Sequence, residues 1–513
     1  MRIIFKEANA ITIELINNDC YYTEPYDIYL NGKYYASKIT NVFSLYDLAP
    51  NTEYNVLING KTIEFKTLDK KIITLKKNKD IVDDTEYINE AIKNLKANEI
   101  LSLEGHFNIT SIEIFDNNKS IYFSPRSTIL CETKREKYKI FESTDIKNNI
   151  VLGTWEGRSD RAFYSPITVV GAKNINLYGP GLIDCNACNS DWWINHREMR
   201  IARRPKGIFI HTSDNVFVEG INLKNTPSWS IHPFYSSNIN IINTRVENPM
   251  DSPTTDGCDP EACLNVNIIG NYFSVGDDCI AIKSSKIELA SLYHRPSSNI
   301  IIRNNIMAHG HAGVTLGSEN SGGINNVYVS QCYFNETDRG LRVKSQRGRG
   351  KDAIISNISF DNIHMNSVKT PFVINAFYKA GNDVIDSRFD EFIHKVDDTT
   401  PSFDTFKFKN IKCDNVSYGL GFFKGLPESH IKNVVLENVW VTYNKNSLEG
   451  IMAMTPNPIK YKGVGFVLSN IDKLELINVK FIDAPLTMYI KDDNVKISEE
   501  WKESTTNLDY IFK

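Results

Sequence analysis

The chain has 513 residues, 41% of them hydrophobic, which is long enough for more than one domain or for one large elongated domain. Its 58 Lys and Arg residues nearly balance 62 Asp and Glu residues, and the net charge of -4 argues against nucleic acid as the main partner. No apolar run approaches the length of a membrane-spanning helix. The start, MRIIFKEANAITIELINN, lacks the features of a secretion signal, so we expect a cytoplasmic protein, or a secreted one if this sequence is a mature form.

Residues 1–70 are predicted to form a small β-sandwich. AITIELIN and EYNVLINGKTIEFKT alternate apolar and polar residues, and the Asn-Gly pairs at Asn31 and Asn59 are typical of hairpin turns. Leu48 and Tyr54 have the spacing of the tyrosine corner, in which a Tyr hydroxyl bonds to the backbone at a sheet crossover. This stretch therefore resembles a fibronectin type III module, with or without a binding role of its own.

A charged connector, LDKKIITLKKNKD, leads into a second predicted domain, residues 71–513. Ile88 and Ile92 lie at helical spacing in the stretch DDTEYINEAIKNLK. Asp83 and Glu86 have the spacing of a capping box, with Asp as the capping residue. We expect a short amphipathic helix that covers the open end of the following domain.

From about residue 165 a short unit recurs, which consists of an Asn, an alternating strand and a polar stretch. Copies begin at Asn174, Asn215, Asn238, Asn265, Asn299, Asn326, Asn357, Asn433 and Lys473. Most neighbouring copies are separated by a repeat of solenoid length. Stacked coils would bury the apolar faces of these strands in a shared core, and each Asn could bond to those above and below it. A leucine-rich pattern is absent, so the predicted fold is an all-β parallel β-helix.

Charged residues recur at matching places on successive repeats. The set comprises Asp256, Asp277, Asp278, His311, Arg342 and Lys344. Asp256, Asp277, His311 and Arg342 are each about one repeat apart, and residues one coil apart stack about 4.7–4.9 Å from one another. We therefore expect three carboxylates, an imidazole and two cations to converge on one outer face. Both adjacent acids can face outward only if the strand bulges or turns there.

Such a cluster suits glycoside hydrolysis, which needs one protonated and one ionised carboxyl group. Repulsion among crowded acids raises the pKa of one of them while the others ionise. Arg342 and Lys344 would moderate the repulsion and could hold the carboxylate of an anionic sugar.

The stretches TTDGCDP, GDDCIAIKS, GHAGVTLGSE and RGLRVKS resemble, in order, the four signature motifs of the polygalacturonases, glycoside hydrolase family 28. The resemblance spans roughly residues 75 to 490. It implies a right-handed parallel β-helix that hydrolyses, with inversion, the α-1,4 bonds between galacturonic acids of a pectic oligosaccharide or polysaccharide. It also implies that the reaction uses no metal and no other cofactor.

The resemblance also implies a role for each acid. Asp277 would be the general acid, and Asp256 and Asp278 would activate the water. His311 would support the protonation state of the acid or bind the sugar. One position departs from the family pattern, because Thr254 replaces the usual Asn before Thr-Asp-Gly. A hydroxyl group there could alter a hydrogen bond near Asp256.

Four residues are candidates for substrate binding. Arg342 and Lys344 would bind the substrate carboxylate at the cleavage point. Tyr378 loosely matches a family tyrosine near that subsite, with Phe377 as the alternative. The aromatic segment TPSWSIHPFYSSNI contains His232, which would serve either packing or sugar contact.

Other cationic and thiol groups are open to two interpretations. Arg203 and Arg204 could reach a sugar carboxylate from a loop. The spacing Cys185-x-x-Cys188 and Cys258-x4-Cys263 could supply zinc ligands, but no His lies nearby at ligand spacing, so we favour reduced thiols.

An N-terminal module and the long polar insertion KAGNDVIDSRFDEFIHKVDDTTPSFDTF are features of exo-acting bacterial members, so we expect action at chain ends. The alternatives are a rhamnogalacturonan or xylogalacturonan hydrolase, a calcium-dependent pectate lyase, and a non-catalytic β-helix that binds carbohydrate. The sequence does not indicate an oligomeric state.

Overall fold

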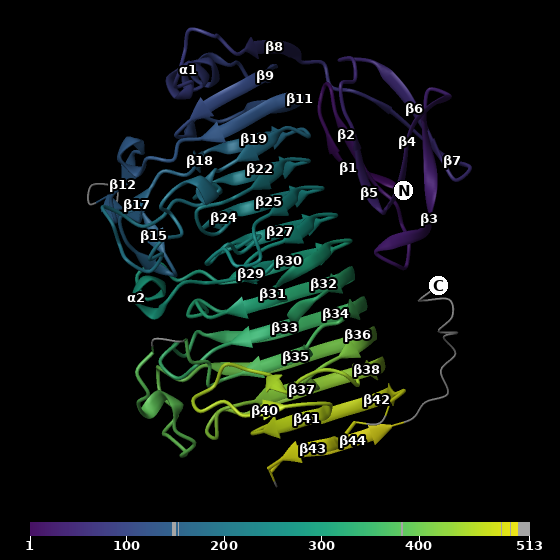
Figure 1. Ribbon diagram of the computed structural model, residues 1–513, viewed down its shortest axis with the longest axis vertical. Coiled ribbons are helices and arrows are strands. Elements are labelled where there is room, and N and C mark those ends of the chain that lie inside the picture. The colour runs from purple at the N-terminus through teal and green to yellow at the C-terminus, as the bar shows by residue number, and fades with distance from the viewer. Residues whose placement is uncertain (146–149, 152, 381–382, 484, 493, 501–513) are drawn as a thin grey trace.

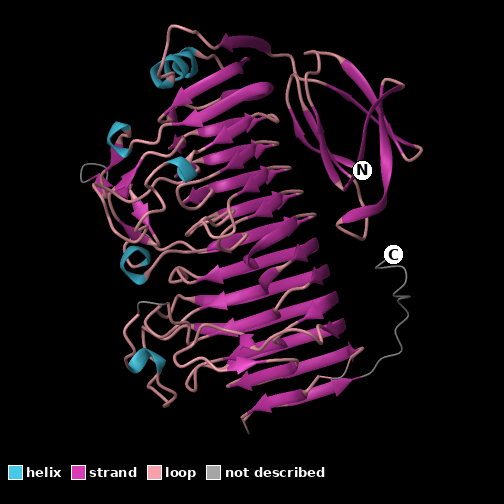
Figure 2. Cartoon of the chain, in the orientation of Figure 1, coloured by secondary structure: helices cyan, strands magenta, loops and turns pink. Residues whose placement is uncertain are grey.

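The computed structural model describes the chain except for residues 146–149, 152, 381–382, 484, 493 and 501–513. Figure 1 shows an elongated stack of parallel strands, with a smaller group of antiparallel strands beside its N-terminal half. Figure 2 shows that strands dominate the chain and that the few helices lie at the margins of the stack. The predicted all-β class is confirmed.

Two antiparallel sheets form the N-terminal module. One sheet contains β1 (Arg2–Lys6), β2 (Ile11–Glu14) and β5 (Val42–Leu45); the other contains β3 (Tyr21–Leu30), β4 (Lys33–Thr40), β6 (Glu53–Ile58) and β7 (Lys61–Lys66). Apolar side chains from both sheets, among them Ile13, Phe43 and Val56, are buried between them. This is the packing of a small β-sandwich, in which each sheet buries one face against the other.

The turns of the module follow the sequence. Asn31 and Asn59 take positive φ angles of 50° and 47° at the β3–β4 and β6–β7 hairpins, as the Asn-Gly pairs predict. The backbone N–H of Ala49 donates a hydrogen bond to the Tyr54 hydroxyl at 2.8 Å. The predicted bond between this tyrosine and the upstream backbone is therefore confirmed.

Buried polar contacts attach the module to the β-helix. Glu219, fully buried at the end of β22, accepts hydrogen bonds from the hydroxyls of Thr12 at 2.8 Å and Tyr46 at 2.9 Å. Arg303 donates two hydrogen bonds to the buried carboxylate of Glu14, at 2.6 and 3.0 Å. Because an unpaired buried carboxylate is costly, these partners hold the module in one position.

Each coil of the β-helix contributes a strand to a long parallel sheet, here called the first sheet. Its strands are β8 (Lys71–Lys76), β9 (Glu99–Ile109), β11 (Lys119–Cys131), β19 (Lys173–Tyr178), β22 (Asp214–Glu219), β25 (Ser237–Ile242), β27 (Leu264–Ile269), β30 (Ser297–Arg303), β32 (Ile324–Asn335), β34 (Ile354–Asn366), β36 (Ser402–Val416), β38 (Ile431–Tyr443), β42 (Leu474–Phe481) and β44 (Ile497–Glu500).

A second set of parallel strands, the second sheet, follows on the same coils. It contains β10 (Ile112–Ile114), β18 (Ile167–Val170), β21 (Ile208–His211), β24 (Ile231–Phe234), β29 (Ile280–Ile282), β31 (Ile306–Gly317), β33 (Thr337–Lys344), β35 (Thr370–Asn375), β37 (Gly419–Lys424), β41 (Val464–Ser469) and β43 (Thr487–Lys491). The short strands β20 (Leu182–Asp184), β23 (Asn222–Lys224), β26 (Arg245–Glu247) and β28 (Tyr272–Ser274) connect the two on four coils.

The smaller elements lie outside these sheets. The short hairpins are β12 (Ile140–Phe141) with β17 (Ala162–Phe163), β13 (Thr144–Asp145) with β14 (Ile150–Val151), β15 (Thr154–Trp155) with β16 (Arg158–Ser159), and β39 (Gly450–Ile451) with β40 (Lys460–Tyr461). The hairpin that contains β15 and the helix α2 (Ile287–Ala290) project on the side of the stack away from the module (Figure 1).

The core of the stack is built from columns of apolar residues in register. In the first sheet, Ile175, Val216, Ile239, Val266 and Ile300 pair in succession from β19 to β30, and all are fully buried. Each such side chain contributes about 1.5–3 kcal/mol on burial. The repeat therefore yields the parallel β-helix that its period predicts.

A ladder of asparagines runs beside these columns, at the turn before the first sheet. The side-chain amides of Asn265, Asn299 and Asn326 each donate to the preceding rung at 3.1, 3.1 and 3.2 Å. These residues adopt positive φ angles of 54–58°, which Asn tolerates better than most residues. The predicted bonding between stacked Asn residues is confirmed. Asn433 aligns with the column but pairs with Thr405, which has no amide to continue the ladder.

The helix α1 (Thr85–Asn94) covers the N-terminal end of the stack, and Ile88 and Ile92 are buried in its core (Figure 1). The predicted capping box is wrong. The capping residue is Asp84, whose carboxylate instead bonds to Lys77 at 2.6 Å, while Asp83 accepts a hydrogen bond from the N–H of Thr85 at 3.0 Å. The helix begins one residue later than the pattern places it, and the ion pair with Lys77 takes the carboxylate of its actual capping residue.

All nine cysteines are free thiols, and Cys188 is exposed while Cys185 is buried. Within the described residues, no group of three or more His, Cys, Asp and Glu side chains is placed to hold a metal ion. Among the helices that the structure describes, none is long and apolar enough to cross a membrane.

Candidate active site

The segment that carries Asp256 takes the place of a strand between β24 and β29. Cys258 pairs with β24 on one side and with Ile280 of β29 on the other. The N–H of Gly257 donates to the carbonyl oxygen of Asp278 at 3.0 Å. Asp256 and Asp278 therefore lie on adjacent coils, as the repeat spacing predicts.

The backbone bends at Asp277, just before β29 begins. The N–H of His311, on the next coil, donates to the carbonyl oxygen of Asp277 at 2.8 Å. Asp278 is fully buried, whereas the side chain of Asp277 is 25% exposed. The local distortion that the two adjacent acids require is present, and it gives them different surroundings.

Asp278 is held between two cations. Lys344 Nζ lies 2.7 Å from Asp278 Oδ2, and Arg342 Nη1 lies 3.2 Å from Asp278 Oδ1. Burial alone would raise the pKa of Asp278, but Lys344 and then Arg342 lower it well below its ordinary value. Arg342 and Lys344 point to the same face of β33, as their alternation predicts, and they keep Asp278 ionised.

Asp277 is paired with an imidazole. His311 Nδ1 lies 3.0 Å from Asp277 Oδ1, and the side chain of His311 is 48% exposed. The hydrogen bond with Asp277 raises the pKa of His311, and the charge of Asp278 adds to this effect. The exposed carboxyl group of the cluster is thus linked to a group that can exchange protons.

Asp256 belongs to a second, buried group of charges. Lys283 Nζ lies 3.4 Å from Asp256, 3.1 Å from Asp259 and 3.7 Å from Glu319. Burial raises the pKa of Asp256 well above its ordinary value, and the charges of Asp259 and Asp277 raise it further. Burial also raises the pKa of Asp259, to about 6, against the opposing effect of Lys283. This pair tends to retain a proton, although Asp256 was expected to act as an ionised carboxylate.

Lys283, Asp259 and Glu319 were not predicted as site residues. Lys283 is the last residue but one of the same GDDCIAIKS stretch, and strand alternation places it on the face opposite Ile280 and Ile282. That alternation was the available signal. Asp259 lies in TTDGCDP and Glu319 ends GHAGVTLGSE, so membership of these two motifs was the available signal for both residues.

The predictions that Tyr378 and His232 bind the substrate have different outcomes. Tyr378 is half-buried, with its ring centre 5.9 Å from the Arg342 guanidinium and 5.6 Å from Lys344 Nζ, whereas Phe377 lies in the core. Tyr378 is therefore the aromatic residue beside the cations. The prediction for His232 is wrong as a direct sugar contact, because this side chain is fully buried.

His232 instead belongs to a packed aromatic group. Its Nε2 lies 3.1 Å from Glu261 Oε2, and its ring stands edge-on to Trp229 at 4.9 Å. Burial lowers the pKa of His232 well below its ordinary value, with Lys206 and Lys283 lowering it further. The neutral imidazole helps to support the aromatic group that packs beside Lys283.

Arg204 binds the hydroxyl group of Thr254, the residue that departs from the family pattern. Its Nη2 donates to Thr254 Oγ1 at 2.7 Å, and its Nη1 donates to the carbonyl oxygens of Pro227 at 2.6 Å and Pro253 at 3.2 Å. Arg204 thus fixes the loop before Asp256, whereas Arg203 pairs with Asp160 at 2.7 Å.

Lys206 packs against the same aromatic group. Its Nζ is 4.1 Å from the ring centre of Trp155 and 4.5 Å from that of Trp229. Among the residues described, no hydrogen-bond acceptor reaches this buried ammonium group. Burial and, after it, the charge of Arg204 lower the pKa of Lys206 to about 7.

The sequence matches the family model described as Glycosyl hydrolases family 28 over residues 139–449, which is more than half of the chain. The chain belongs to this family. The four motifs that carry the resemblance all lie within the matched segment, so the recognition made from them is confirmed.

Relatives of this family 28 member carry related names. It is 29% identical over 281 residues to "Probable polygalacturonase" of Vitis vinifera, covering 52% of the chain and 54% of that protein. It is 29% identical over 232 residues to "Endo-polygalacturonase" of Pectobacterium parmentieri, covering 43% of the chain and 55% of that protein. The matches span about half the length of these curated relatives.

Two solved structures of exopolygalacturonases share the fold. The Yersinia enterocolitica family 28 exopolygalacturonase aligns with a TM-score of 0.68 at 17% identity, covering 97% of each chain. The hyperthermoactive exopolygalacturonase of Thermotoga maritima aligns with a TM-score of 0.59 at 22% identity, covering 76% of this chain and 94% of the other. At these identities the likeness establishes the fold alone.

Proposed function

We propose that this family 28 protein hydrolyses the α-1,4 bonds between galacturonic acid residues of pectic oligosaccharides and polysaccharides, with inversion at the anomeric carbon. The observation that carries the proposal is the contrast between Asp278 and Asp277. Lys344 and Arg342 hold Asp278 ionised, while Asp277 is partly exposed and bonded to His311. A glycosidase needs this division between a base and an acid.

In this proposal Asp277 donates its proton to the glycosidic oxygen as the bond from that oxygen to the anomeric carbon breaks. A water molecule attacks the anomeric carbon from the opposite face, and its proton passes to Asp278. Asp256, on the adjacent coil, helps to orient the water. The cycle closes when Asp278 releases the water's proton to solvent and Asp277 regains one from solvent, which the half-exposed imidazole of His311, hydrogen-bonded to Asp277, can relay.

The cations explain the choice of a uronic acid. Arg342 and Lys344 lie beside Tyr378, so a substrate carboxylate can join the charge network that they already form with Asp278. Arg favours the planar geometry of a carboxylate, and Lys adds a second positive charge. A neutral sugar would leave this excess of positive charge without a partner.

We further propose that the protein acts at chain ends. Support comes from chain segments that lie on both sides of the carboxylates. On one side, Arg347 anchors the long insertion by donating to the carbonyl oxygens of Asp390 at 2.7 Å and Phe392 at 3.0 Å, and to Glu428 at 2.6 Å. On the other side stand Trp155 and the loop held by Arg204. The exopolygalacturonases from Yersinia and Thermotoga, which share the fold, agree with this proposal.

The test is chromatography of the products formed from defined oligogalacturonides, with ultraviolet absorbance recorded. The wild type, Asp277→Asn and the exposed-site control Asp251→Asn are compared. Stepwise release of saturated mono- or digalacturonate by the wild type and the control, but not by Asp277→Asn, is expected. Random mid-chain products would overturn the exo proposal alone.

Other outcomes would overturn the activity itself. Unsaturated, ultraviolet-absorbing products would indicate a lyase. Turnover of rhamnogalacturonan or xylogalacturonan, without turnover of homogalacturonan, would indicate a hydrolase for another pectic backbone. Binding without turnover on every substrate would indicate a carbohydrate-binding protein.

A further inference from the structure

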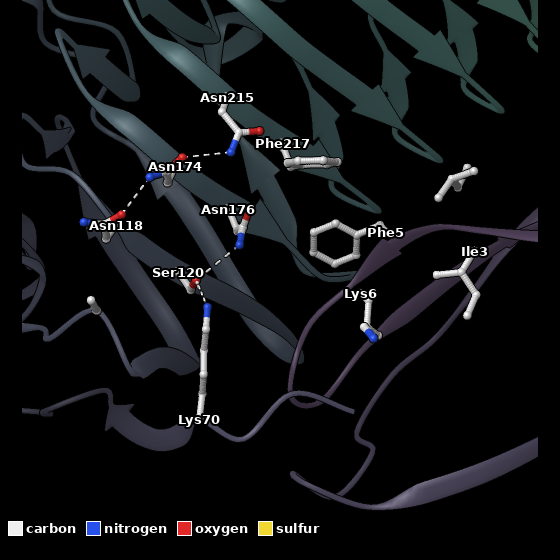
Figure 3. A pocket seen from close by; sticks show the side chains of 12 residues that line it. Ile3, Phe5, Lys6, Lys70, Asn118, Ser120, Asn174, Asn176, Asn215 and Phe217 are labelled. Carbon is white, nitrogen blue, oxygen red and sulfur yellow. Dashed lines mark hydrogen bonds between the residues drawn. The ribbon is translucent and has the colours of Figure 1, made fainter. Parts of the chain in front are cut away.

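A pocket of about 460 Å³ lies between the N-terminal module and the first sheet. It is lined by Ile3, Ile4, Phe5, Lys6, Lys70, Ala97, Asn118, Ser120, Asn174, Asn176, Asn215 and Phe217. Figure 3 shows the module supplying one side and the strands of the β-helix the other. Its volume falls in the range of small-molecule sites, which often form where two structural units meet.

One wall of this pocket is a short asparagine ladder. Asn174 donates to Asn118 at 2.8 Å, and Asn215 donates to Asn174 at 2.8 Å (Figure 3). The next rung, Asn238, donates instead to Asp214 at 2.7 Å. Among the described residues nothing therefore donates to Asn215 Oδ1, and the ladder presents amide groups at regular spacing along the wall.

Aromatic side chains add apolar surface to the lining. The rings of Phe5 and Phe217 lie 5.5 Å apart at an angle of 49°, and Figure 3 shows both beside the amides. Phe217 is half-buried, so part of its ring remains accessible. Amides beside one partly exposed aromatic ring, that of Phe217, suit a sugar, which has polar hydroxyls and apolar C–H faces.

The charge of the lining is positive. Its ionisable side chains are Lys6 and Lys70, and it contains no acidic residue, although the chain as a whole has more acidic than basic residues. Lys70 is committed, because its Nζ lies 2.7 Å from the buried carboxylate of Glu7, which also accepts from Ser120. Lys6 is exposed and forms no ion pair with any described residue.

We propose that this pocket is a second carbohydrate-binding site, which takes an acidic oligosaccharide of the uronate class. The choice of a uronate rests on the proposed function, and the site itself rests on the amides, the rings and the uncommitted charge of Lys6. The pocket is built on β19 and β22 of the first sheet, whereas the carboxylates of the candidate active site lie on the coil of β29 and on the coil between β24 and β29. A chain held here stays near the enzyme after each cleavage, which raises its local concentration.

The test uses calorimetric titration of trigalacturonate into the full chain carrying Asp277→Asn, which prevents turnover. Two binding sites are expected. Adding Lys6→Glu should remove one site or weaken it about tenfold, because it replaces an attractive charge with a repulsive one. Asn215→Asp is a second variant with the same expected direction, and Lys33→Glu, an exposed charge reversal elsewhere in the module, is the control. Thermal unfolding checks that each variant folds.

Three outcomes would overturn the proposal: a single site in the parent, two sites of unchanged affinity after both pocket changes, or equal binding of galactotriose, which has no carboxylate. The result is separable from the proposed function. If the wild type hydrolyses no galacturonan but the Lys6-dependent site still binds trigalacturonate, the activity fails and this site stands. With an active site intact, Lys6→Glu should leave kcat on trigalacturonate unchanged and raise KM on long polygalacturonate.

Discussion

Two rows of polar side chains run along the same coils, and they differ in charge and in how their polar groups are satisfied. The asparagine ladder is neutral, and each rung of its central part satisfies the next, as between Asn265 and Asn299. The carboxylate cluster is charged and held by ion pairs: Lys283 lies 3.1 Å from Asp259 and 3.4 Å from Asp256, while the nearby ammonium group of Lys206 is buried without a hydrogen-bond acceptor among the described residues. The ladder stabilises the coil, whereas the cluster buries charges whose desolvation is only partly compensated.

The largest effect should come from the exposed acid of the cluster. Asp277→Asn removes the proton donor, and we expect kcat to fall by about 10²–10⁴-fold. The melting temperature should change little, because the side chain is partly exposed and its partner His311 can reach solvent. Steady-state kinetics beside a thermal melt checks both. A loss of activity that merely followed a loss of folding would remove Asp277 from its role.

Lys344→Met should show how much the ion pair between Lys344 and Asp278 contributes to the free energy of unfolding. It leaves Asp278 buried with a single cation, and we expect a loss of about 3 kcal/mol in unfolding free energy. The lowered pKa of Asp278 means that its stabilisation is present above its unfolded value, near 4, and is lost as the pH falls below it.

Urea unfolding from pH 7 to pH 3 measures this prediction. The difference between wild type and Lys344→Met should shrink toward the acid end. Asp278→Asn added to Lys344→Met should recover part of the stability. A difference that does not depend on pH would show that Lys344 acts through packing alone.

In the ladder, Asn265→Ala should cost about 1–2 kcal/mol. It removes hydrogen bonds to Asn238 and Asn299, and it places Ala at a φ of 58°, which non-glycine residues seldom adopt. Asn265→Gly, which tolerates this φ, should recover the backbone part of the loss. Chemical unfolding of the two variants checks the ranking, and activity on short oligomers should persist in both.

The smallest effect has the opposite sign. Lys206→Met should stabilise the protein by about 1 kcal/mol below pH 7, because the variant no longer buries a charge, although it gives up contacts with Trp155 and Trp229. The folded pKa of Lys206, about 7, is below its unfolded value, so wild-type stability rises with pH between the two. The gain should therefore fade as the pH is raised toward 10, which thermal melts at pH 6, 8 and 9.5 would show.

The fold and most of the cluster could be predicted because they repeat. A fixed period places Asp256, Asp278 and Arg342 on neighbouring coils whatever the details of the turns. The approach of Asp259 and Glu319 to Lys283 was missed although all three lie in the same motifs, because the sequence does not show which polar residues of a motif turn toward a buried cation. The burial of His232 was missed for a related reason: an aromatic segment next to the site has the same sequence pattern whether it faces the core or the substrate.

The same reasoning explains the error at α1. Its sequence fits a capping box. However, Lys77, which directly follows the preceding strand, binds the carboxylate of Asp84. A local sequence pattern cannot indicate a partner that tertiary packing brings in. The tyrosine corner at Tyr54 was predictable because both partners lie within a few residues of each other.

The helix α1 also has a consequence for self-association. The terminal coil of a stack of parallel strands presents unpaired backbone groups and an open apolar core, and β8 pairs only with β9 on this side. With Ile88 and Ile92 inserted over that core, α1 blocks the surface on which another chain could continue the stack. Without it, one molecule would be a template for the next, and the end of an enzyme would become the growing tip of a fibre.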